Sequence, residues 1–215
     1  GRHPDLVVLP ESLLENDTAV CIDCALKEET ELEFTEFIFC EQDKTRLCSL
    51  AHEYQTVVGM GFTAAIMPFQ YARPYLVPVY LIAFPDGSTV LFEKCDLPRQ
   101  VLQVSGLTIS LVICAEAGVD RYFASACDLI IWVCRVPDTQ TRFLTNDLFQ
   151  GRRMIGKSAP VLFVNNFDPY HPYSPSAVFN SEGKGLFEFP SGSQMGFIDV
   201  AAQGSISVHT CRPIR

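Results

Sequence analysis

Leu107-Thr-Ile-Ser-Leu-Val-Ile113 is an apolar run that ends abruptly in Cys114-Ala-Glu-Ala-Gly118. A short apolar run rich in branched residues and bounded by a turn signal is typical of a buried strand. Such a strand delivers the Cys114 thiol directly into a turn, beside free backbone N–H groups. Folds hold nucleophiles in this way, although free cysteine is also among the most buried residue types. Cys114 is therefore a candidate nucleophile, and a core cysteine is the alternative.

Two further apolar runs end at an ionisable residue. Asp5-Leu-Val-Val-Leu-Pro-Glu11 ends in a carboxylate, and Thr89-Val-Leu-Phe-Glu-Lys94 ends in an ammonium. A carboxylate can take the proton of a thiol, and an ammonium can stabilise a thiolate and later an oxyanion. Taken singly, Glu11 could be an acid at a helix N-terminus and Lys94 a solvated strand end. Together the three strand ends predict Glu11, Lys94 and Cys114 as a catalytic set.

With these residues in place, the chain resembles the carbon–nitrogen hydrolase (nitrilase) superfamily over nearly its whole length. The resemblance implies an α/β fold of the αββα sandwich type, with residues 1–215 as a single domain and subunits that pair into a dimer. The motifs that carry it lie in this order: Leu6-Val-Val-Leu-Pro-Glu11, Val57-Val-Gly-Met60, Phe84-Pro-Asp-Gly-Ser88 followed by Lys94, Leu111-Val-Ile-Cys-Ala-Glu116, Cys127-Asp-Leu-Ile-Ile131, Gly151-Arg-Arg-Met154 followed by Ala159-Pro-Val-Leu-Phe-Val-Asn-Asn166, and Ser176-Ala-Val-Phe-Asn-Ser-Glu-Gly183.

The resemblance also implies a mechanism, which is thiol-dependent hydrolysis of a small linear amide or nitrile without a cofactor or a metal. Glu11 is expected to activate Cys114 as a general base and then to protonate the departing amine. Cys114 is expected to form a thioester with the acyl group. Lys94 and the backbone N–H of Ala115 are expected to hold the oxyanion, and water activated by Glu11 then releases the acid.

Ala115, Glu116 and Arg135 are the predicted oxyanion-binding and substrate-binding residues. Glu116 is either a second acid beside the nucleophile or a turn carboxylate. Arg135 follows a predicted strand and is a candidate anchor for a substrate carboxylate, because a guanidinium binds carboxylate through two hydrogen bonds; a surface ion pair is its alternative. The Cys21-x-x-Cys24 pair has no second pair of the same kind, so no metal site is predicted.

The sequence departs from the family pattern at two places. Only ten residues precede Glu11, whereas family members usually carry a first strand and helix there, so the N-terminal strand and helix of the sandwich are expected to be missing. Between Leu97 and Ile113 there is no acidic residue, although many relatives place a second glutamate in this stretch. Two alternatives therefore stay open: an acyltransferase that passes the acyl group to an amine, and a catalytically weakened member that acts as a binding or scaffold subunit.

Composition places limits on partners and location. The chain has 48% hydrophobic residues, and none of its apolar runs approaches the roughly 18 residues of a membrane span. Nine scattered cysteines, an odd number, favour reduced thiols and a cytoplasmic location, with secretion after removal of a leader as the alternative. Residues 11–43 hold eleven acidic residues against one lysine, which predicts either a solvated face or a docking surface for a basic partner. Nothing resembles a nucleic-acid-binding surface. The expected partners are a small amide substrate and a second copy of the chain.

A coarse reading of apolar periodicity and turn residues predicts alternating strands and helices. In the helix expected over 42–54, Leu47, Leu50 and Ala51 are expected to share one buried face. Hairpins are expected at Pro85–Ser88 and at Asn180–Gly183, and an irregular loop over Met67–Pro78. The expected strands are 5–10, 56–61, 79–84, 89–94, 107–113, 129–134, 160–165, 176–180, 185–189 and 196–200; the other expected helices are 118–126 and 139–157.

Overall fold

The fold is taken from a computed structural model. It describes residues 4–9, 41–66, 75–97, 100–118, 122, 126–134, 159–165, 175–189, 194–201 and 205–213. Contacts between residues divide the chain into two compact units, residues 1–94 and residues 95–215. The single domain expected over the whole chain stays a prediction.

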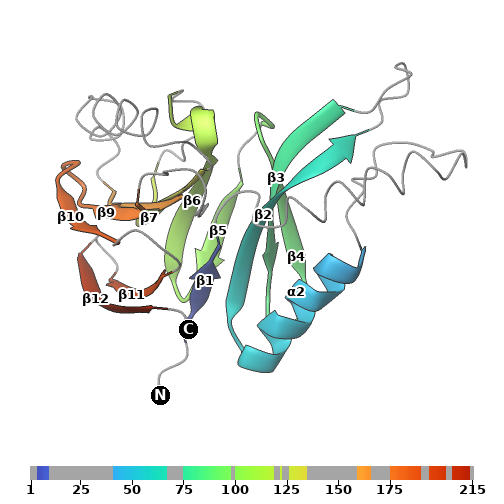
Figure 1. The fold of residues 1–215 in the computed structure, drawn as a ribbon, viewed down its shortest axis with the longest axis horizontal. Helices are drawn as coiled ribbons and strands as arrows, with labels where there is room; N and C mark the ends of the chain where they lie inside the picture. The colour runs from blue at the N-terminus through green and yellow to red at the C-terminus, as the bar shows by residue number, and fades with distance from the viewer. Residues whose placement is uncertain are drawn as a thin grey trace, which may run out of the picture. The chain divides into compact units, whose positions relative to one another are not determined.

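The N-terminal unit contains a four-stranded sheet in the order β1-β2-β3-β4 (Figure 1). Strand β1 (Leu6–Val8) runs parallel to β2 (Val57–Ile66). Strand β2 pairs antiparallel with β3 (Tyr75–Ala83), which pairs antiparallel with β4 (Thr89–Glu93). Helix α2 (Glu41–Tyr54) confirms the helix expected over 42–54.

Helix α2 packs on this sheet through Leu47 and Ala51, which are buried against side chains of β2 and β3. Leu50 was expected on the same face, but its side chain is 38% exposed. An α-helix turns by about 100° per residue, so Leu47 and Ala51 lie close together around the axis while Leu50 lies on the other side of Leu47. The half-buried Cys48 joins the buried face instead, and the prediction for Leu50 was wrong.

The hairpin between β3 and β4 is confirmed at Pro85–Ser88. Gly87 has φ +86°, and the backbone N–H of Phe84 donates to the Ser88 carbonyl at 2.9 Å. The loop expected over Met67–Pro78 is wrong for 75–78, which belong to β3, while 67–74 lie outside the described residues. Pro78 has no backbone N–H to donate, but its carbonyl accepts from the Lys94 N–H at 2.9 Å, one residue beyond the last β3–β4 pair, Val79 and Glu93.

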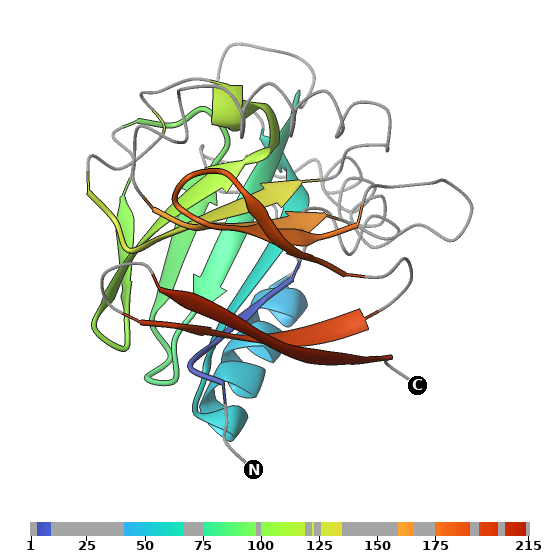
Figure 2. The same cartoon turned by 90° about the vertical axis from the view of Figure 1, so that its left-hand side faces the viewer.

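The C-terminal unit contains a six-stranded sheet in the order β10-β9-β8-β7-β6-β5 (Figure 2). Its centre is parallel, with β6 pairing to β7 and β7 to β8, and the remaining pairs are antiparallel. A separate hairpin is formed by the last two strands. The strands of this unit are β5 (Val101–Val104), β6 (Leu107–Ile113), β7 (Leu129–Cys134), β8 (Val161–Asn165), β9 (Ala177–Phe179), β10 (Gly185–Glu188), β11 (Gln194–Val200) and β12 (Ile206–Pro213).

Several expectations for this unit are confirmed and others are corrected. The hairpin at Asn180–Gly183 is confirmed, with Gly183 at φ +77°. Strands β5 and β12 were not expected. A helix was expected to begin at Gly118, but Gly118 instead ends the 3₁₀ turn η1 (Cys114–Gly118). Most of 118–126 and all of 139–157 lie outside the described residues.

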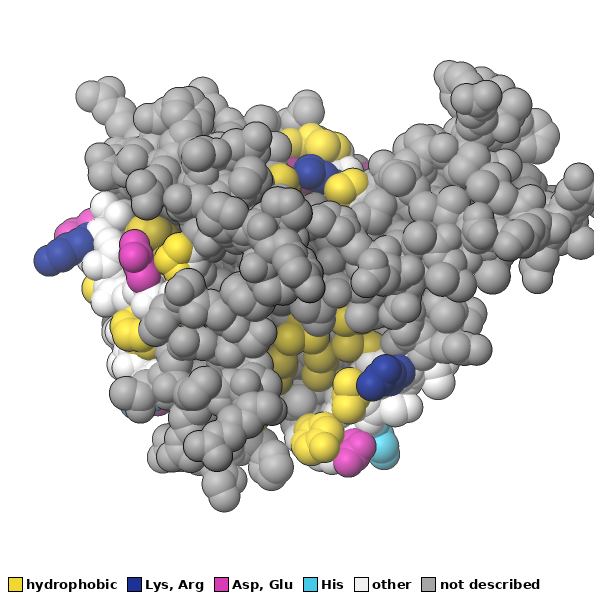
Figure 3. All heavy atoms as spheres, in the orientation of Figure 1, with side chains coloured by type: hydrophobic (Ala, Val, Ile, Leu, Met, Phe, Trp, Pro, Cys, Tyr) yellow, Lys and Arg dark blue, Asp and Glu magenta, His cyan; other side chains and the backbone are white. Residues whose placement is uncertain are grey.

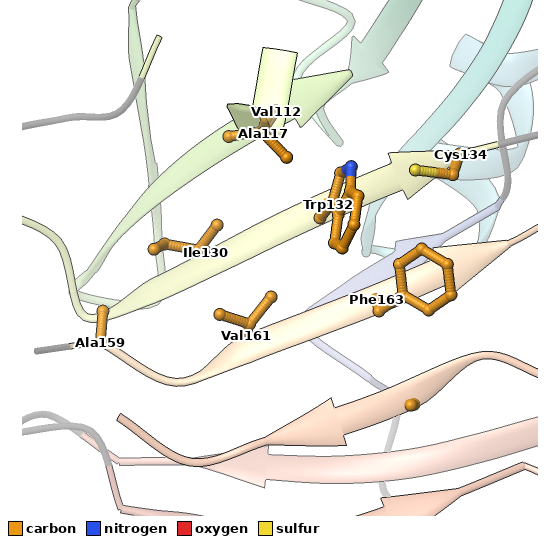
Figure 4. Close-up of a cluster of buried hydrophobic side chains, with 9 residues drawn as sticks. Val112, Ala117, Ile130, Trp132, Cys134, Ala159, Val161 and Phe163 are labelled. Carbon is orange, nitrogen blue, oxygen red and sulfur yellow. The ribbon is translucent and has the colours of Figure 1, made fainter. Parts of the chain in front are cut away.

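The core of the C-terminal unit surrounds β7, whose six residues are all buried. A continuous apolar run of this kind is typical of a parallel strand covered on both faces. Trp132 and Phe163 lie at the centre, with ring centroids 4.8 Å apart (Figure 4). The cluster also includes Val112, Ala117, Ile130, Cys134, Ala159, Val161 and Ala177, with the half-buried Cys114, Cys127 and Phe179 packed against it.

Exposed hydrophobic side chains occur in several places on the face drawn in Figure 3. The large ones among the described residues are Leu50, Tyr54, Leu97, Val101 and Leu186. Within the described part of the chain, no helix is both long and apolar enough to cross a membrane.

Candidate active site

Two of the three predicted catalytic residues lie where the sequence placed them, directly after strands. Lys94 follows β4, is half-buried, and its backbone N–H donates to the Pro78 carbonyl at 2.9 Å. Cys114 follows β6. Glu11 lies outside the described residues, and the described part of β1 and its continuation ends at Leu9. The convergence of the three side chains therefore stays a prediction.

Cys114 occupies a sharp elbow between β6 and η1. Its φ of +51° lies in the left-handed region, which costs a non-glycine residue on the order of 1–3 kcal/mol unless its surroundings enforce it. Contacts on both sides of the residue do enforce it. The indole Nε1–H of the buried Trp132 donates to the Cys114 carbonyl at 2.8 Å, and the backbone N–H of Ile113 donates to Glu116 at 2.7 Å. The half-buried Cys114 side chain is thus carried on a fixed backbone.

Glu116 is buried, with 2% of its surface exposed, and both of its carboxylate oxygens accept backbone hydrogen bonds. Oε2 accepts from Ile113, and Oε1 accepts from the backbone N–H of Cys95 at 2.5 Å. Cys95 is itself left-handed, with φ +69°, and its carbonyl accepts from the Tyr122 hydroxyl at 3.4 Å. These contacts favour the turn-carboxylate alternative for Glu116 over a second acid beside the nucleophile.

A buried tyrosine holds the chain just before Glu11. The Tyr80 hydroxyl donates to the Leu9 carbonyl at 2.6 Å, and the Leu9 backbone N–H donates to the Gly59 carbonyl at 2.9 Å. Burial raises the pKa of Tyr80 above its ordinary range because the phenolate would lose its hydration, so the hydroxyl stays a donor. A side chain at Gly59 would come within 2.7 Å of both Tyr80 and Ile82. Leu9 is therefore anchored two residues before Glu11.

The carboxyl ends of β6, β7 and β8 lie at one edge of the six-stranded sheet. Ile113 pairs with Val133, and Cys134 pairs with Asn165. Ligands of open α/β sheets bind at this edge. Asn165 is buried, and its backbone N–H donates to the Ser176 hydroxyl at 3.0 Å. Sequence reasoning did not assign Asn165, although it follows an apolar run in the same way as Cys114.

The remaining predicted site residues stay predictions. Arg135 lies outside the described residues, and Ala115 is described in its backbone, within η1. Among the described residues there is no group of three or more His, Cys, Asp or Glu side chains that could hold a metal ion. Cys21 and Cys24 lie outside the described residues, as does the acidic segment up to residue 40.

The described cysteines are free thiols that differ in exposure. Cys95 is exposed and Cys134 is buried, whereas Cys48, Cys114 and Cys127 are half-buried. Cys114 and Cys127 pack against the same core cluster, so they make a matched pair for tests of reactivity.

No protein-family model and no curated protein sequence matches the chain. Solved structures do match it. A carbon–nitrogen hydrolase superfamily protein from Xanthomonas campestris, XC1258, aligns with 96% of this chain and 77% of its own at 16% identity, with a TM-score of 0.64. The chain has the carbon–nitrogen hydrolase fold. The predicted resemblance and the predicted fold class are thereby confirmed.

A second match to the carbon–nitrogen hydrolase fold is the amidase from Nesterenkonia sp. AN1. A variant of this amidase, with the acetamide moiety of fluoroacetamide added covalently at its active-site cysteine, aligns with 86% of this chain and 73% of its own at 15% identity, with a TM-score of 0.62. Another variant of the same amidase, which is described as a member of the nitrilase superfamily, aligns with 86% of this chain and 73% of its own at 15% identity, with a TM-score of 0.59. Similarity at these identities establishes the fold.

Proposed function

We propose that this chain hydrolyses a non-peptide carbon–nitrogen bond of a small linear amide, with Cys114 as nucleophile, Glu11 as general base and Lys94 as oxyanion ligand. One observation carries the proposal. In a chain with the carbon–nitrogen hydrolase fold, Cys114 lies at the end of a buried strand in a left-handed conformation that two separate hydrogen-bonding groups hold. Strain of this kind is concentrated at functional sites.

The comparisons support the same chemistry. The Nesterenkonia amidase carries an acetamide moiety on its active-site cysteine, and XC1258 carries an arsenic adduct in its active site. The acetamide adduct shows that the active-site cysteine of that amidase variant forms a covalent bond to a small amide-derived group. By analogy of fold, Cys114 is the cysteine of this chain that we assign to the same position, because it alone among the described cysteines follows the end of a parallel strand in a turn with positive φ and half-buried exposure.

The proposed reaction begins when the Glu11 carboxylate takes the Cys114 thiol proton as the sulfur attacks the amide carbon. The carbonyl electrons move to oxygen, and the Lys94 ammonium and the Ala115 backbone N–H stabilise the resulting oxyanion. Glu11 returns the proton to the amine, because an amine is a poor leaving group unless it is protonated, and the C–N bond breaks. A thioester remains on Cys114. Water, losing a proton to Glu11, then adds to the thioester and releases the acid and the thiol.

The test is a panel of small amides and nitriles assayed for ammonia release with wild type, Cys114→Ala and Cys127→Ala. We expect Cys114→Ala to abolish turnover and Cys127→Ala to retain it, since both thiols are half-buried against the same core. Ammonia release that survives Cys114→Ala would refute the proposal. Adding a primary amine to the assay distinguishes hydrolysis from acyl transfer, because a transferase gives an amide product instead of the acid.

Labelling tests the nucleophile without a known substrate. With iodoacetamide at pH 7, Cys114 should react ahead of the other eight cysteines, as mapped by mass spectrometry of the digested protein. An activated cysteine is present as thiolate at neutral pH, whereas an ordinary thiol with a pKa of about 8.5 is mostly protonated. Uniform slow labelling would favour the scaffold alternative. Pairing into a homodimer and a cytoplasmic location belong to the same proposal, and sedimentation analysis tests the first of them.

A further inference from the structure

We propose that Glu116 is a positioning residue that clamps the backbone beside Cys114 and beside Lys94, and that it thereby sets the reactivity of Cys114. The part of this inference that concerns reactivity rests on the proposed function. Glu116 is buried to 2% exposure, and each oxygen of its carboxylate accepts one backbone N–H. One N–H belongs to Ile113, the residue before Cys114. The other belongs to Cys95, the residue after Lys94.

Both clamped segments have a strained backbone. Cys114 has φ +51° and Cys95 has φ +69°, and left-handed non-glycine residues persist only where the surroundings hold them. Each segment is held on its amide side by Glu116 and on its carbonyl side by another buried group. Trp132 donates to the Cys114 carbonyl, and Tyr122 donates to the Cys95 carbonyl. Glu116 is the one group among these contacts that joins the two segments.

The chemistry of the side chain explains why a carboxylate is needed here. An ionised carboxylate accepts hydrogen bonds with both oxygens and donates none, so it can satisfy two converging N–H groups. A glutamine of the same length has one accepting oxygen, and its amide nitrogen would face the second N–H as another donor. Glu116→Gln therefore changes the size of the side chain very little but breaks one arm of the clamp.

The first measurement is backbone hydrogen exchange at Cys95 and Ile113 in wild type, Glu116→Gln and the control Glu182→Gln. Glu182 lies in an exposed turn, so Glu182→Gln makes the same glutamate-to-glutamine change at an exposed position. In Glu116→Gln at least one of the two amides should exchange about tenfold faster, because hydrogen bonds to charged acceptors are stronger than neutral ones. Exchange that stays at the wild-type rate at both amides would overturn the inference. This measurement depends on no enzymatic activity.

The second measurement is the pH dependence of iodoacetamide labelling at Cys114 in the same three proteins. In Glu116→Gln labelling at pH 7 should slow several-fold, and its pH profile should shift toward that of an ordinary thiol, while Glu182→Gln follows wild type. If Glu116 has a purely structural role, the pH profile of labelling stays unchanged in Glu116→Gln, and that result would overturn the inference. The labelling rates of Cys114 and Cys127 in the wild-type protein are compared first. If Cys114 reacts no faster than Cys127, the proposed function is refuted.

Discussion

The substitution Trp132→Phe tests whether the elbow at Cys114 depends on the core behind it. Trp132 is fully buried, and its Nε1–H donates to the Cys114 carbonyl at 2.8 Å. Loss of this donor to the part-buried Cys114 carbonyl costs about 1–3 kcal/mol. Replacing the indole by a phenyl ring also leaves a void beside Phe163, which adds about 1–2 kcal/mol. We therefore expect the free energy of unfolding to fall by about 2–5 kcal/mol, measured by urea denaturation.

The decisive readout for Trp132→Phe is the labelling of Cys114 under conditions where every protein is folded. Phe163→Leu is the matched control. Phe163 is fully buried, and its ring centroid lies 4.8 Å from that of Trp132. Its truncation opens a void but leaves the indole hydrogen bond in place. Labelling of Cys114 at pH 7 should slow several-fold in Trp132→Phe and stay near the wild-type rate in Phe163→Leu. Equal labelling rates in the two variants would show that the indole hydrogen bond does not hold the nucleophile, and would refute the reasoning.

Three further predictions follow from the N-terminal unit. Tyr80→Phe should lower the free energy of unfolding in urea by about 1–3 kcal/mol. Because the pKa of Tyr80 is raised in the fold, the wild-type free energy of unfolding should also fall above about pH 10, by roughly 1.4 kcal/mol per pH unit. Tyr80→Phe should lack this contribution to the pH dependence. Gly59→Ala should cost about 1–3 kcal/mol by overpacking against Tyr80, whereas Gly185→Ala, whose added carbon meets Phe179 at 3.9 Å, should change the urea midpoint little. Lys94→Met should slow Cys114 labelling at pH 7 several-fold, and the exposed control Lys184→Met should not; equal rates would remove Lys94 from the site.

The strands whose ends carry Lys94 and Cys114 could be predicted because their signal is local. Each is a short run rich in apolar residues that is followed directly by the predicted residue, and that pattern depends on no other part of the chain. Strand β5 was missed for a different reason. It alternates exposed and buried residues over only four positions, and its turn to β6 is Ser105-Gly106, with both residues at positive φ. Ser-Gly signals such a two-residue hairpin turn less strongly than Asn-Gly or Asp-Gly.

The position of Leu50 was missed because apolar spacing gives a face only approximately. Residues three apart and four apart both count as neighbours on a helix, so the triplet Leu47, Leu50 and Ala51 fits a buried face in the sequence. The sheet selects the side of Leu47 that carries Ala51 and Cys48. That choice depends on the partner surface of β2 and β3, which the sequence of the helix does not contain.

Glu116 was a predicted site residue, but the long-range hydrogen bonds of Glu116 and Trp132 were not predicted because these partners are distant in the sequence. Trp132 reaches back 18 residues to Cys114, and Glu116 reaches back 21 residues to Cys95. A general rule could nevertheless have drawn attention to them, since a buried polar side chain must find a hydrogen-bond partner. Trp132 stands in the middle of an entirely apolar run, where its indole N–H needs an acceptor. The rule identifies the residue, and the fold is needed to supply the acceptor.

Three buried polar side chains contact the backbone close to the predicted catalytic residues. Tyr80 binds the Leu9 carbonyl, two residues before Glu11. Glu116 binds the amides next to Lys94 and Cys114, and Trp132 binds the carbonyl of Cys114 itself. Each of these buried polar side chains costs desolvation free energy that an apolar residue would avoid. Each contacts backbone within two residues of a predicted catalytic group. We propose that these contacts fix the backbone beside the three predicted residues.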